Sequence, residues 1–291
     1  MITPELLAQV RRLTIRSRRA VEEVFSGAYR SAFRGQGLEF AEVREYVPGD
    51  DIRAIDWNVT ARVGHPFVKR FDEERELTVV VALDLSGSLR FGSRGRTKRE
   101  TAAEAGALVA LAAARNRDRV GLLLFTDQIE LYLPPSKSRA RALRLVRDMV
   151  ALEPKGTGTD LGQALAFLGR VLRRRATVFV ISDWITEEFD RPLAHLARRH
   201  ELVVLEVSDP FEAVVPPSGL VQVEDLETGR TEWVDLGARR PRQEWRAAQS
   251  RRARRLGESF VRGRAGRIAL STDQPVAPAL IRHFEARTRR R

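Results

Sequence analysis

Apolar runs alternate with segments of helical periodicity through the middle of the chain. Leu77 to Leu83 and Val178 to Ile181 are apolar at nearly every position, as in strands that are buried on both faces of a parallel sheet. Between such runs, apolar residues recur every three or four positions. The predicted strands are 77–84, 119–125, 128–133, 176–182 and 201–207, and the predicted helices are 97–116, 138–150, 160–174 and 190–199. The pattern predicts an α/β fold with a doubly wound, mostly parallel sheet and helices on both faces.

The residues before and after this core have other patterns. Residues 3 to about 30 have the spacing of an amphipathic helix, whereas 33–76 is rich in glycine and charge and predicts irregular structure. Glu227-Thr228-Gly229 lies between two short strand-like segments, which indicates a hairpin. An arginine-rich helix, a strand near 267–271 and a helix near 276–288 follow. We therefore divide the chain into three parts. Residues 1–32 form an N-terminal helix, and 33–76 form a charged segment that packs on the main domain. The main domain is 77–291, with a hairpin inserted at about 210–237.

The loop after the first predicted core strand carries candidate metal chemistry. Asp84-Leu85-Ser86-Gly87-Ser88 places one carboxylate and two hydroxyls at alternate positions just past the strand. A hard divalent cation binds such oxygen donors, and the carboxyl ends of strands are where open α/β sheets bind ligands. The alternative is a loop whose serines only cap the next helix.

Two later segments extend this pattern. Gly158-Thr159-Asp160-Leu161-Gly162 lies between two helical segments, and the strand at 176–182 ends in Ser182-Asp183. The order of these segments resembles the von Willebrand factor A fold, which is Rossmann-like, and its metal-ion-dependent adhesion site (MIDAS). That resemblance implies one Mg²⁺ or Mn²⁺ ion and the following ligands: Asp84, Ser86, Ser88, Thr159 and Asp183. Thr157 is the nearest competitor for the threonine role.

The same resemblance implies how such a site works. The hydroxyls of Ser86 and Ser88 bind the ion directly, whereas Asp84 and Asp183 act mostly through water, which leaves a position for an acidic residue of a partner protein. Asp160 is interpreted as the N-cap of the next helix and not as a ligand.

Residues 35–62 carry a longer and more specific pattern. It comprises Gly35-Gln36-Gly37-Leu38-Glu39-Phe40, then the run from Arg44 to Arg53, and then Ile55-Asp56-Trp57-Asn58 with Thr60-Ala61-Arg62. This is similar to the hallmark of domain of unknown function family 58 (DUF58), in which such a segment precedes a von Willebrand A-like domain. Some relatives have membrane-spanning helices ahead of this segment, and we expect this chain to be one of the soluble members.

The charged residues of the hallmark allow two interpretations. The first is a structural belt of ion pairs, with Tyr46 and Trp57 packed on the main sheet. The second is a partner-binding surface. The candidate residues for it are Arg44, Asp50, Asp51, Arg53, Asp56 and Arg62.

Composition narrows the class of protein. The chain has 291 residues, of which 43% are hydrophobic and 31% charged, as in ordinary globular proteins. It has no run of eighteen apolar residues, and its first residues lack the apolar core of a signal peptide. The absence of cysteine excludes disulfides, thiolate metal sites and a cysteine nucleophile. A cytoplasmic location without membrane contact is the expectation.

The net charge of +12 is concentrated in arginines between 239 and 267. The simpler interpretation is a surface helix with a solvated basic face, and the other is a contact with nucleic acid or an acidic protein. Neither zinc-finger ligands nor an RNP-like aromatic motif supports direct readout of nucleic acid.

The sequence does not favour catalysis. Ser86 follows a strand, but a hydrolase nucleophile elbow needs glycines where Asp84 and Ser88 stand. The segment Gly92 to Lys98 departs from the P-loop pattern because lysine does not directly follow the second glycine. The family resemblance implies a non-catalytic adaptor or co-chaperone of a MoxR-type AAA+ ATPase or of its client in protein complex maturation. The alternative is a polyanion-binding factor that uses the 239–267 arginines.

Overall fold

The computed structural model describes residues 4–33, 39–72, 76–186, 188–213 and 218–289. Its centre is a six-stranded sheet with the order β10-β7-β6-β3-β4-β5. All neighbouring pairs are parallel except β4 and β5, which are antiparallel. The strands are β3 (Thr78–Asp84), β4 (Arg119–Phe125), β5 (Ile129–Ser136), β6 (Thr177–Ser182), β7 (Glu201–Ser208) and β10 (Gly266–Ser271). The predicted α/β class and mostly parallel sheet are confirmed.

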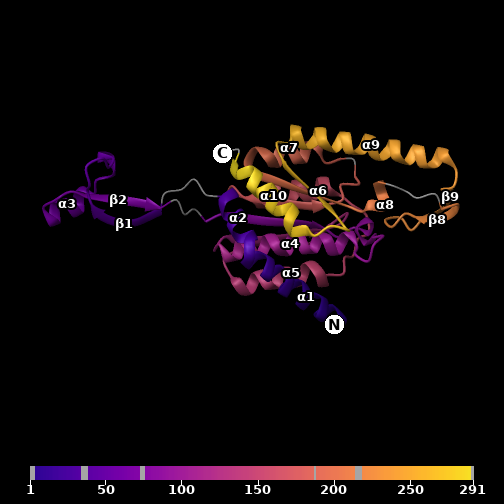
Figure 1. Ribbon diagram of the computed structural model, residues 1–291, viewed down its shortest axis with the longest axis horizontal. Coiled ribbons are helices and arrows are strands. Elements are labelled where there is room, and N and C mark those ends of the chain that lie inside the picture. Colours follow the sequence, from indigo (N-terminus) through magenta and orange to yellow (C-terminus); the bar gives the residue numbers. More distant parts are fainter. Residues whose placement is uncertain (1–3, 34–38, 73–75, 187, 214–217, 290–291) are drawn as a thin grey trace.

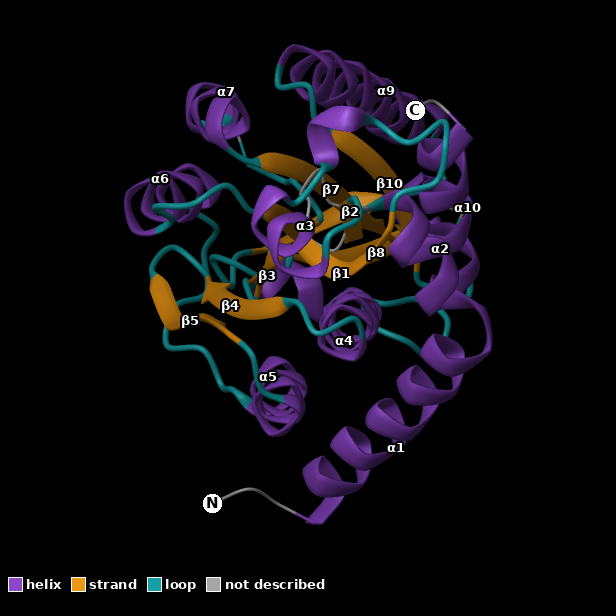
Figure 2. Cartoon of the chain, turned by 90° about the vertical axis from the view of Figure 1, so that its left-hand side faces the viewer, coloured by secondary structure: helices purple, strands orange, loops and turns teal. Residues whose placement is uncertain are grey.

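Helices cover both faces of the sheet, as Figure 2 shows. The described helices of the main body are α4 (Lys98–Arg115), α5 (Arg139–Ala151), α6 (Leu161–Val171), α7 (Asp190–Arg199), α8 (Pro210–Ala213), α9 (Arg239–Arg262) and α10 (Val276–Arg289), with the 3₁₀ turn η3 (Gly87–Arg90). Alternate residues of β3 enter two separate clusters, because side chains alternate across a strand. Val79 and Val81 pack with α4, α5 and α10, whereas Val80 and Ala82 pack with α6, α7 and α9.

The N-terminal region is helical, as predicted, and packs on the α4 side of the sheet (Figure 1). It consists of α1 (Pro4–Ala20), a π-helical turn η1 (Val21–Phe25) and α2 (Ser26–Ala32). The hydroxyl of Tyr29 donates a hydrogen bond to Asp118 Oδ2 at 3.0 Å, and Asp118 Oδ1 accepts from the backbone N–H of Leu77 at 2.9 Å. Asp118 therefore ties α2 to the start of β3.

An aromatic cluster joins α2 to α10 and to the sheet. Phe284 of α10 lies at its centre, with ring centroids 5.3 Å from Phe25, 6.0 Å from Tyr29, 5.2 Å from Phe33 and 6.4 Å from Phe179. All five side chains are buried. Helix α2 and the last described helix, α10, thus share one core.

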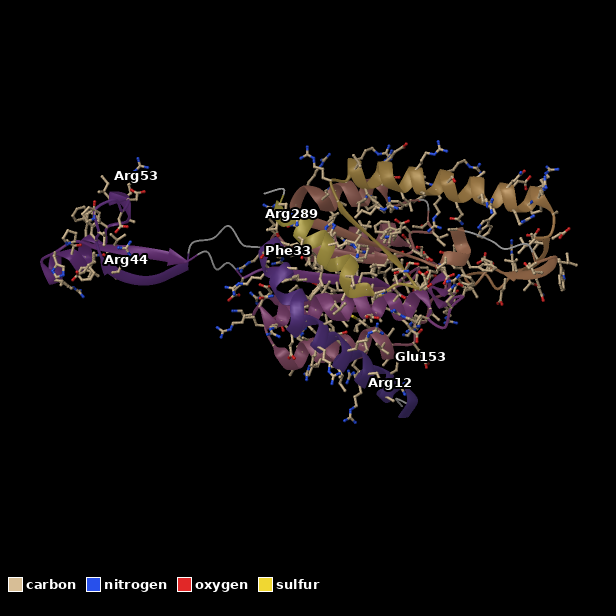
Figure 3. The ribbon with its side chains drawn as sticks, viewed as in Figure 1. Arg12, Phe33, Arg44, Arg53, Glu153 and Arg289 are labelled. Carbon is tan, nitrogen blue, oxygen red and sulfur yellow. The ribbon has the colours of Figure 1, made fainter. Side chains whose placement is uncertain are left out.

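Residues 39–72 form a small unit of their own, where the sequence predicted irregular structure. Strands β1 (Glu39–Glu45) and β2 (Phe67–Asp72) pair antiparallel, and between them lie a 3₁₀ turn, η2 (Ile52–Ala54), and helix α3 (Trp57–Val63). Figures 1 and 3 show this unit, with Arg44 and Arg53, standing away from the main sheet. Trp57 is 69% exposed, so the prediction that it packs on the main sheet was wrong.

The carboxylates of this unit serve mainly as caps and turn anchors. Asp51 accepts from the backbone N–H of Arg53 at 2.9 Å, and Asp56 accepts from the backbone N–H groups of Asn58 and Val59 at 3.0 and 3.3 Å. The backbone donors at the start of a helical turn need an acceptor, and a preceding aspartate supplies one. The expected belt of ion pairs is therefore partly replaced by caps.

Substitution of Asp56 by alanine tests this cap. Asp56 begins α3 and is buried, so we expect its loss to destabilise the 39–72 unit by about 1 kcal/mol. Hydrogen exchange of the amides of 57–63 should then accelerate, while that of β3 stays unchanged because β3 belongs to the separate main core. Asn58→Ala, at an exposed neighbouring position, is the control. Equal acceleration in β3 would contradict the independence of the unit.

The predicted hairpin is present as β8 (Leu220–Glu224) and β9 (Thr231–Asp235), a separate antiparallel pair. It lies at the end of the main body opposite the 39–72 unit (Figure 1). Long helix α9 follows it and runs along one face of the body. Among the described residues, no helix combines the length and apolar character needed to cross a bilayer.

Candidate functional site

Parallel pairing of β3 with β6 brings two acidic residues to the same end of the sheet. Asp84 is the last residue of β3, and Asp183 directly follows β6. Both side chains are fully buried. Burial raises the pKa of Asp84 to about 7, and the nearby charge of Asp183 contributes to the rise. The two predicted carboxylates therefore lie close together at the carboxyl edge.

The loop after β3 folds around the Asp84 carboxylate. Asp84 Oδ1 accepts from the backbone N–H of Ser86 at 2.8 Å, and Oδ2 accepts from the Ser182 hydroxyl at 2.6 Å. The hydroxyls of Ser86 and Ser88 are 3.2 Å apart. Ser86 precedes η3 but makes no side-chain cap bond to it, and Ser88 lies within this turn. The hydroxyls thus gather beside the carboxylates, as the metal-site interpretation expects.

Thr159 reaches this edge from the loop before α6. Its hydroxyl donates to Glu227 Oε1 at 2.6 Å, and the nearby Ser88 hydroxyl also lowers the pKa of the Glu227 carboxylate. The competing residue, Thr157, is exposed and donates to the main-chain carbonyl of Glu227 at 3.1 Å. Burial raises the pKa of Glu227, an effect that the hydrogen bond from Thr159 opposes. Asp160 caps α6 through the backbone N–H of Gln163 at 2.7 Å, so the prediction of its capping role is confirmed.

A buried lysine that the sequence analysis missed pairs with Asp183. Lys98 Nζ donates to Asp183 Oδ2 at 2.7 Å and to Glu212 Oε1 at 2.6 Å, and the lysine is only 1% exposed. Burial by itself lowers the pKa of Lys98, but the charges of Asp183 and Glu212 outweigh it and raise that pKa. A sequence signal existed, since Lys98 is a rare lysine in an arginine-rich chain and opens the helix after the candidate loop.

The donor set suits a hard divalent cation. Two carboxylates and three hydroxyls offer oxygen atoms alone, which Mg²⁺ and Mn²⁺ prefer. The Asp183 carboxylate accepts from Lys98 through one oxygen and from the backbone N–H of Ile185 through the other. Both oxygens are thus already occupied, which fits a carboxylate that would contact an ion through water and not directly. Within the described residues, no three His, Cys, Asp or Glu side chains are grouped to hold a metal ion, so a site here depends on the hydroxyls.

The second set of predicted residues lies far from this edge, on the 39–72 unit (Figure 3). Arg44 forms a bidentate pair with Asp50, with N–O distances of 2.8 and 2.7 Å. That hydrogen bonding lowers the pKa of Asp50. Asp51 and Asp56 cap helical turns, whereas the side chains of Arg53 and Arg62 are exposed. The two predicted sites are therefore separate surfaces.

Helix α9 also contacts the acidic edge. Arg252 donates to the main-chain carbonyl of Asp183, and Trp245 Nε1 donates to that of Glu212 at 2.7 Å. Leu256 and Phe260 of α9 are buried against the sheet. Most of its arginines are exposed, as expected for a solvated basic face. The basic helix thus has a packing role whatever else it binds.

Comparisons with known proteins agree with the hallmark. The family model described as "Protein of unknown function DUF58" matches residues 42–255. "Uncharacterized protein Rv1480" of Mycobacterium tuberculosis is 34% identical over 229 residues, which are 78% of this chain and 72% of that protein. Among solved structures, the conserved hypothetical protein BatB from Bacteroides thetaiotaomicron has a TM-score of 0.48 at 18% identity, covering 73% of this chain and 99% of BatB. The SpRpn10 VWA domain has a TM-score of 0.37 at 12% identity, covering 71% and 94%.

Proposed function

This chain belongs to the DUF58 family of proteins of unknown function, and within that family we propose that it is a non-catalytic protein-interaction module whose contact depends on a divalent cation. The observation that carries the proposal is the meeting of five predicted oxygen donors at the carboxyl edge of β3 and β6. Asp84 and Asp183 are buried there, and the hydroxyls of Ser86, Ser88 and Thr159 lie in the same hydrogen-bonded cluster.

The roles of the residues follow from their positions. Ser86, Ser88 and Thr159 would hold a Mg²⁺ or Mn²⁺ ion through their hydroxyls, and Asp84 and Asp183 would supply the negative charge. When bound, the ion would accept a carboxylate from outside. The Ser86 N–H and the Ser182 hydroxyl hold the Asp84 carboxylate in place, and Lys98 holds that of Asp183. The two carboxylates are therefore positioned before any partner binds. An acidic residue of a partner protein fits this chemistry, because a carboxylate completes an oxygen shell.

The proposed partner is a MoxR-type AAA+ ATPase or its client, with this chain as adaptor or co-chaperone in protein complex maturation. The family resemblance supports this partner. The site residues account for binding of an acidic group, but they do not identify the protein that carries it. The exposed Trp57, Ile52 and Val47 of the 39–72 unit offer an additional contact surface. A cytoplasmic location stays a prediction.

Loss of Asp84 is the direct test of the metal. We expect the wild-type protein to bind Mn²⁺ and Mg²⁺ in calorimetric titrations, and Asp84→Ala to lose this binding because it removes a buried carboxylate of the site. Ser88→Ala, at a partly exposed position, is a second variant with less risk to folding and should bind at least tenfold more weakly. Asp127→Asn, a nearby exposed acid outside the proposed set, should bind like the wild type.

The partner test uses the purified ATPase. Binding to a MoxR-type ATPase, followed by calorimetry, should require Mg²⁺ or Mn²⁺ and disappear with chelator or with Ser88→Ala. Failure of the wild type to bind either ion would overturn the metal-dependent function. The polyanion alternative predicts instead an interaction with nucleic acid that ignores chelator and weakens steeply with salt, because counterions are released from the polyanion on binding.

A further inference from the structure

The turn of the β8–β9 hairpin lies directly on the candidate metal loop. A Cβ atom added to Gly87 would stand 2.0 Å from the main-chain oxygen of Leu226, closer than real atoms approach. Gly87, between the two serines of the loop, therefore lets the hairpin turn touch the site. The two segments are about 140 positions apart in sequence, and the fold of the insertion brings them together.

Glu227 in this turn takes the hydroxyls that the ion would use. Thr159 donates to Glu227 Oε1 at 2.6 Å, and the Ser88 hydroxyl is close enough to lower the pKa of the same carboxylate. Thr157 donates to the main-chain oxygen of Glu227 at 3.1 Å. The side chain of Glu227 therefore points into the hydroxyl cluster.

The turn is built to present Glu227 in this way. Asp225 Oδ1 accepts from the backbone N–H of Glu227 at 2.9 Å, and Asp225 Oδ2 accepts from the Thr228 hydroxyl at 2.8 Å. Gly229 has a φ of +70°, a conformation that glycine adopts at little cost. These local bonds fix the shape of the turn.

A glutamate in this position brings a further acid close to Asp183, whose charge acts on it. Carboxylates that share a small space repel one another, and a cation between them removes the repulsion. A carboxylate and the hydroxyls that lie beside it can also bind one ion together. The geometry thus matches that of a ligand supplied by the chain itself.

We infer that Glu227 is an internal carboxylate ligand of this site and that the β8–β9 turn occupies the place of a partner's acidic residue. The inference rests on the proposed metal-dependent function. It adds a regulatory step, because an incoming acidic residue must displace the turn. Displacement of the hairpin exposes little buried surface, since all ten residues of β8 and β9 are exposed or only partly buried and the two strands form a sheet of their own.

The test compares Glu227→Gln with Glu232→Gln in the full chain. Glu232 lies on β9 of the same hairpin and is exposed, so its change alters the hairpin's charge equally without touching the site. Mn²⁺ titration should show about tenfold weaker binding for Glu227→Gln. At saturating Mn²⁺, water proton relaxation should be faster in that variant, because a water replaces the lost carboxylate. Glu232→Gln should behave like the wild type in both measurements.

A small acidic probe completes the experiment. The peptide acetyl-Gly-Glu-Gly-amide should slow water relaxation in Mn²⁺-loaded Glu227→Gln at a concentration at least tenfold lower than in the wild type, whose own glutamate competes. Circular dichroism and thermal unfolding establish that each variant is folded, and Glu227→Asp gives a second, milder change if Glu227→Gln is unstable.

The outcomes separate the two proposals. Wild-type protein that binds no Mn²⁺ overturns the proposed function and, with it, this inference. Wild-type and Glu227→Gln proteins that bind Mn²⁺ with the same affinity and the same water relaxation overturn the internal ligand alone. In that case Glu227 only satisfies the threonine hydroxyls, and the metal-dependent function stands.

Discussion

Replacement of Lys98 by methionine is expected to lower the free energy of unfolding by about 3–5 kcal/mol. The ammonium group is buried between Asp183 and Glu212, and removal of one partner from a buried ion pair leaves uncompensated charge. Methionine keeps most of the apolar stem, so the change reports mainly on the charge. Because the pKa of Lys98 is raised, this stabilisation is fully present at neutral pH and is lost only as the pH rises above the ordinary lysine range.

Chemical denaturation at pH 7 measures this effect, and Lys137→Met is the matched control. Lys137 pairs with Glu76 on the surface, where its side chain is 48% exposed, and surface pairs contribute about 0–1 kcal/mol. Addition of Glu212→Gln to Lys98→Met should recover part of the loss, because it removes one unpaired acid. Equal stability of Lys98→Met and Lys137→Met would show that Lys98 does not hold the acidic edge together.

Phe284→Ala is expected to cost about 3–5 kcal/mol of stability. Its ring is fully buried and contacts aromatic rings of η1, α2 and β6, so truncation removes apolar contacts and leaves a cavity. We expect α2 to loosen from the sheet, which would speed hydrogen exchange across 26–32. Phe284→Leu should cost less, because leucine fills part of the space.

The exposed aromatic Phe211 supplies the comparison. It is 36% exposed, and its ring lies 6.3 Å from that of Phe91, so Phe211→Ala should cost about 1 kcal/mol or less. Denaturant unfolding of Phe284→Ala, Phe284→Leu and Phe211→Ala measures the loss of unfolding free energy in each variant. Similar losses for Phe284→Ala and Phe211→Ala would contradict the central place of Phe284 in the core.

The main sheet could be predicted from sequence because its strands are buried on both faces. Strands at 77–84, 119–125 and 201–207 were predicted within a residue or so of β3, β4 and β7. The 39–72 unit could not, since the pairing of β1 with β2 is interrupted by an irregular register between Phe40 and Glu42, and its charged residues obscure the alternation. A strand that is not deeply buried leaves a weak apolar signal.

The candidate site was predictable only where its residues lie beside predicted strand ends. Asp84 and Asp183 follow apolar runs, so the sequence located them. Glu212 and Glu227 were not assigned to the site, because they reach it from a later insertion and meet Lys98 and Thr159 only through tertiary packing. Local periodicity has no information about such contacts. The roles of Glu212 and Glu227 are visible only in the folded structure.

The core shared by α2 and α10 cannot be completed until the end of the chain has been synthesised. Arg287 on α10 bonds to the Ala32 carbonyl of α2 across 255 positions, so the rings of Phe25, Tyr29 and Phe33 have no complete partner until α10 has left the ribosome. At about 10 residues per second, that interval is roughly half a minute. During it, the nascent chain carries an open aromatic surface, the kind of surface that chaperones bind and that drives aggregation.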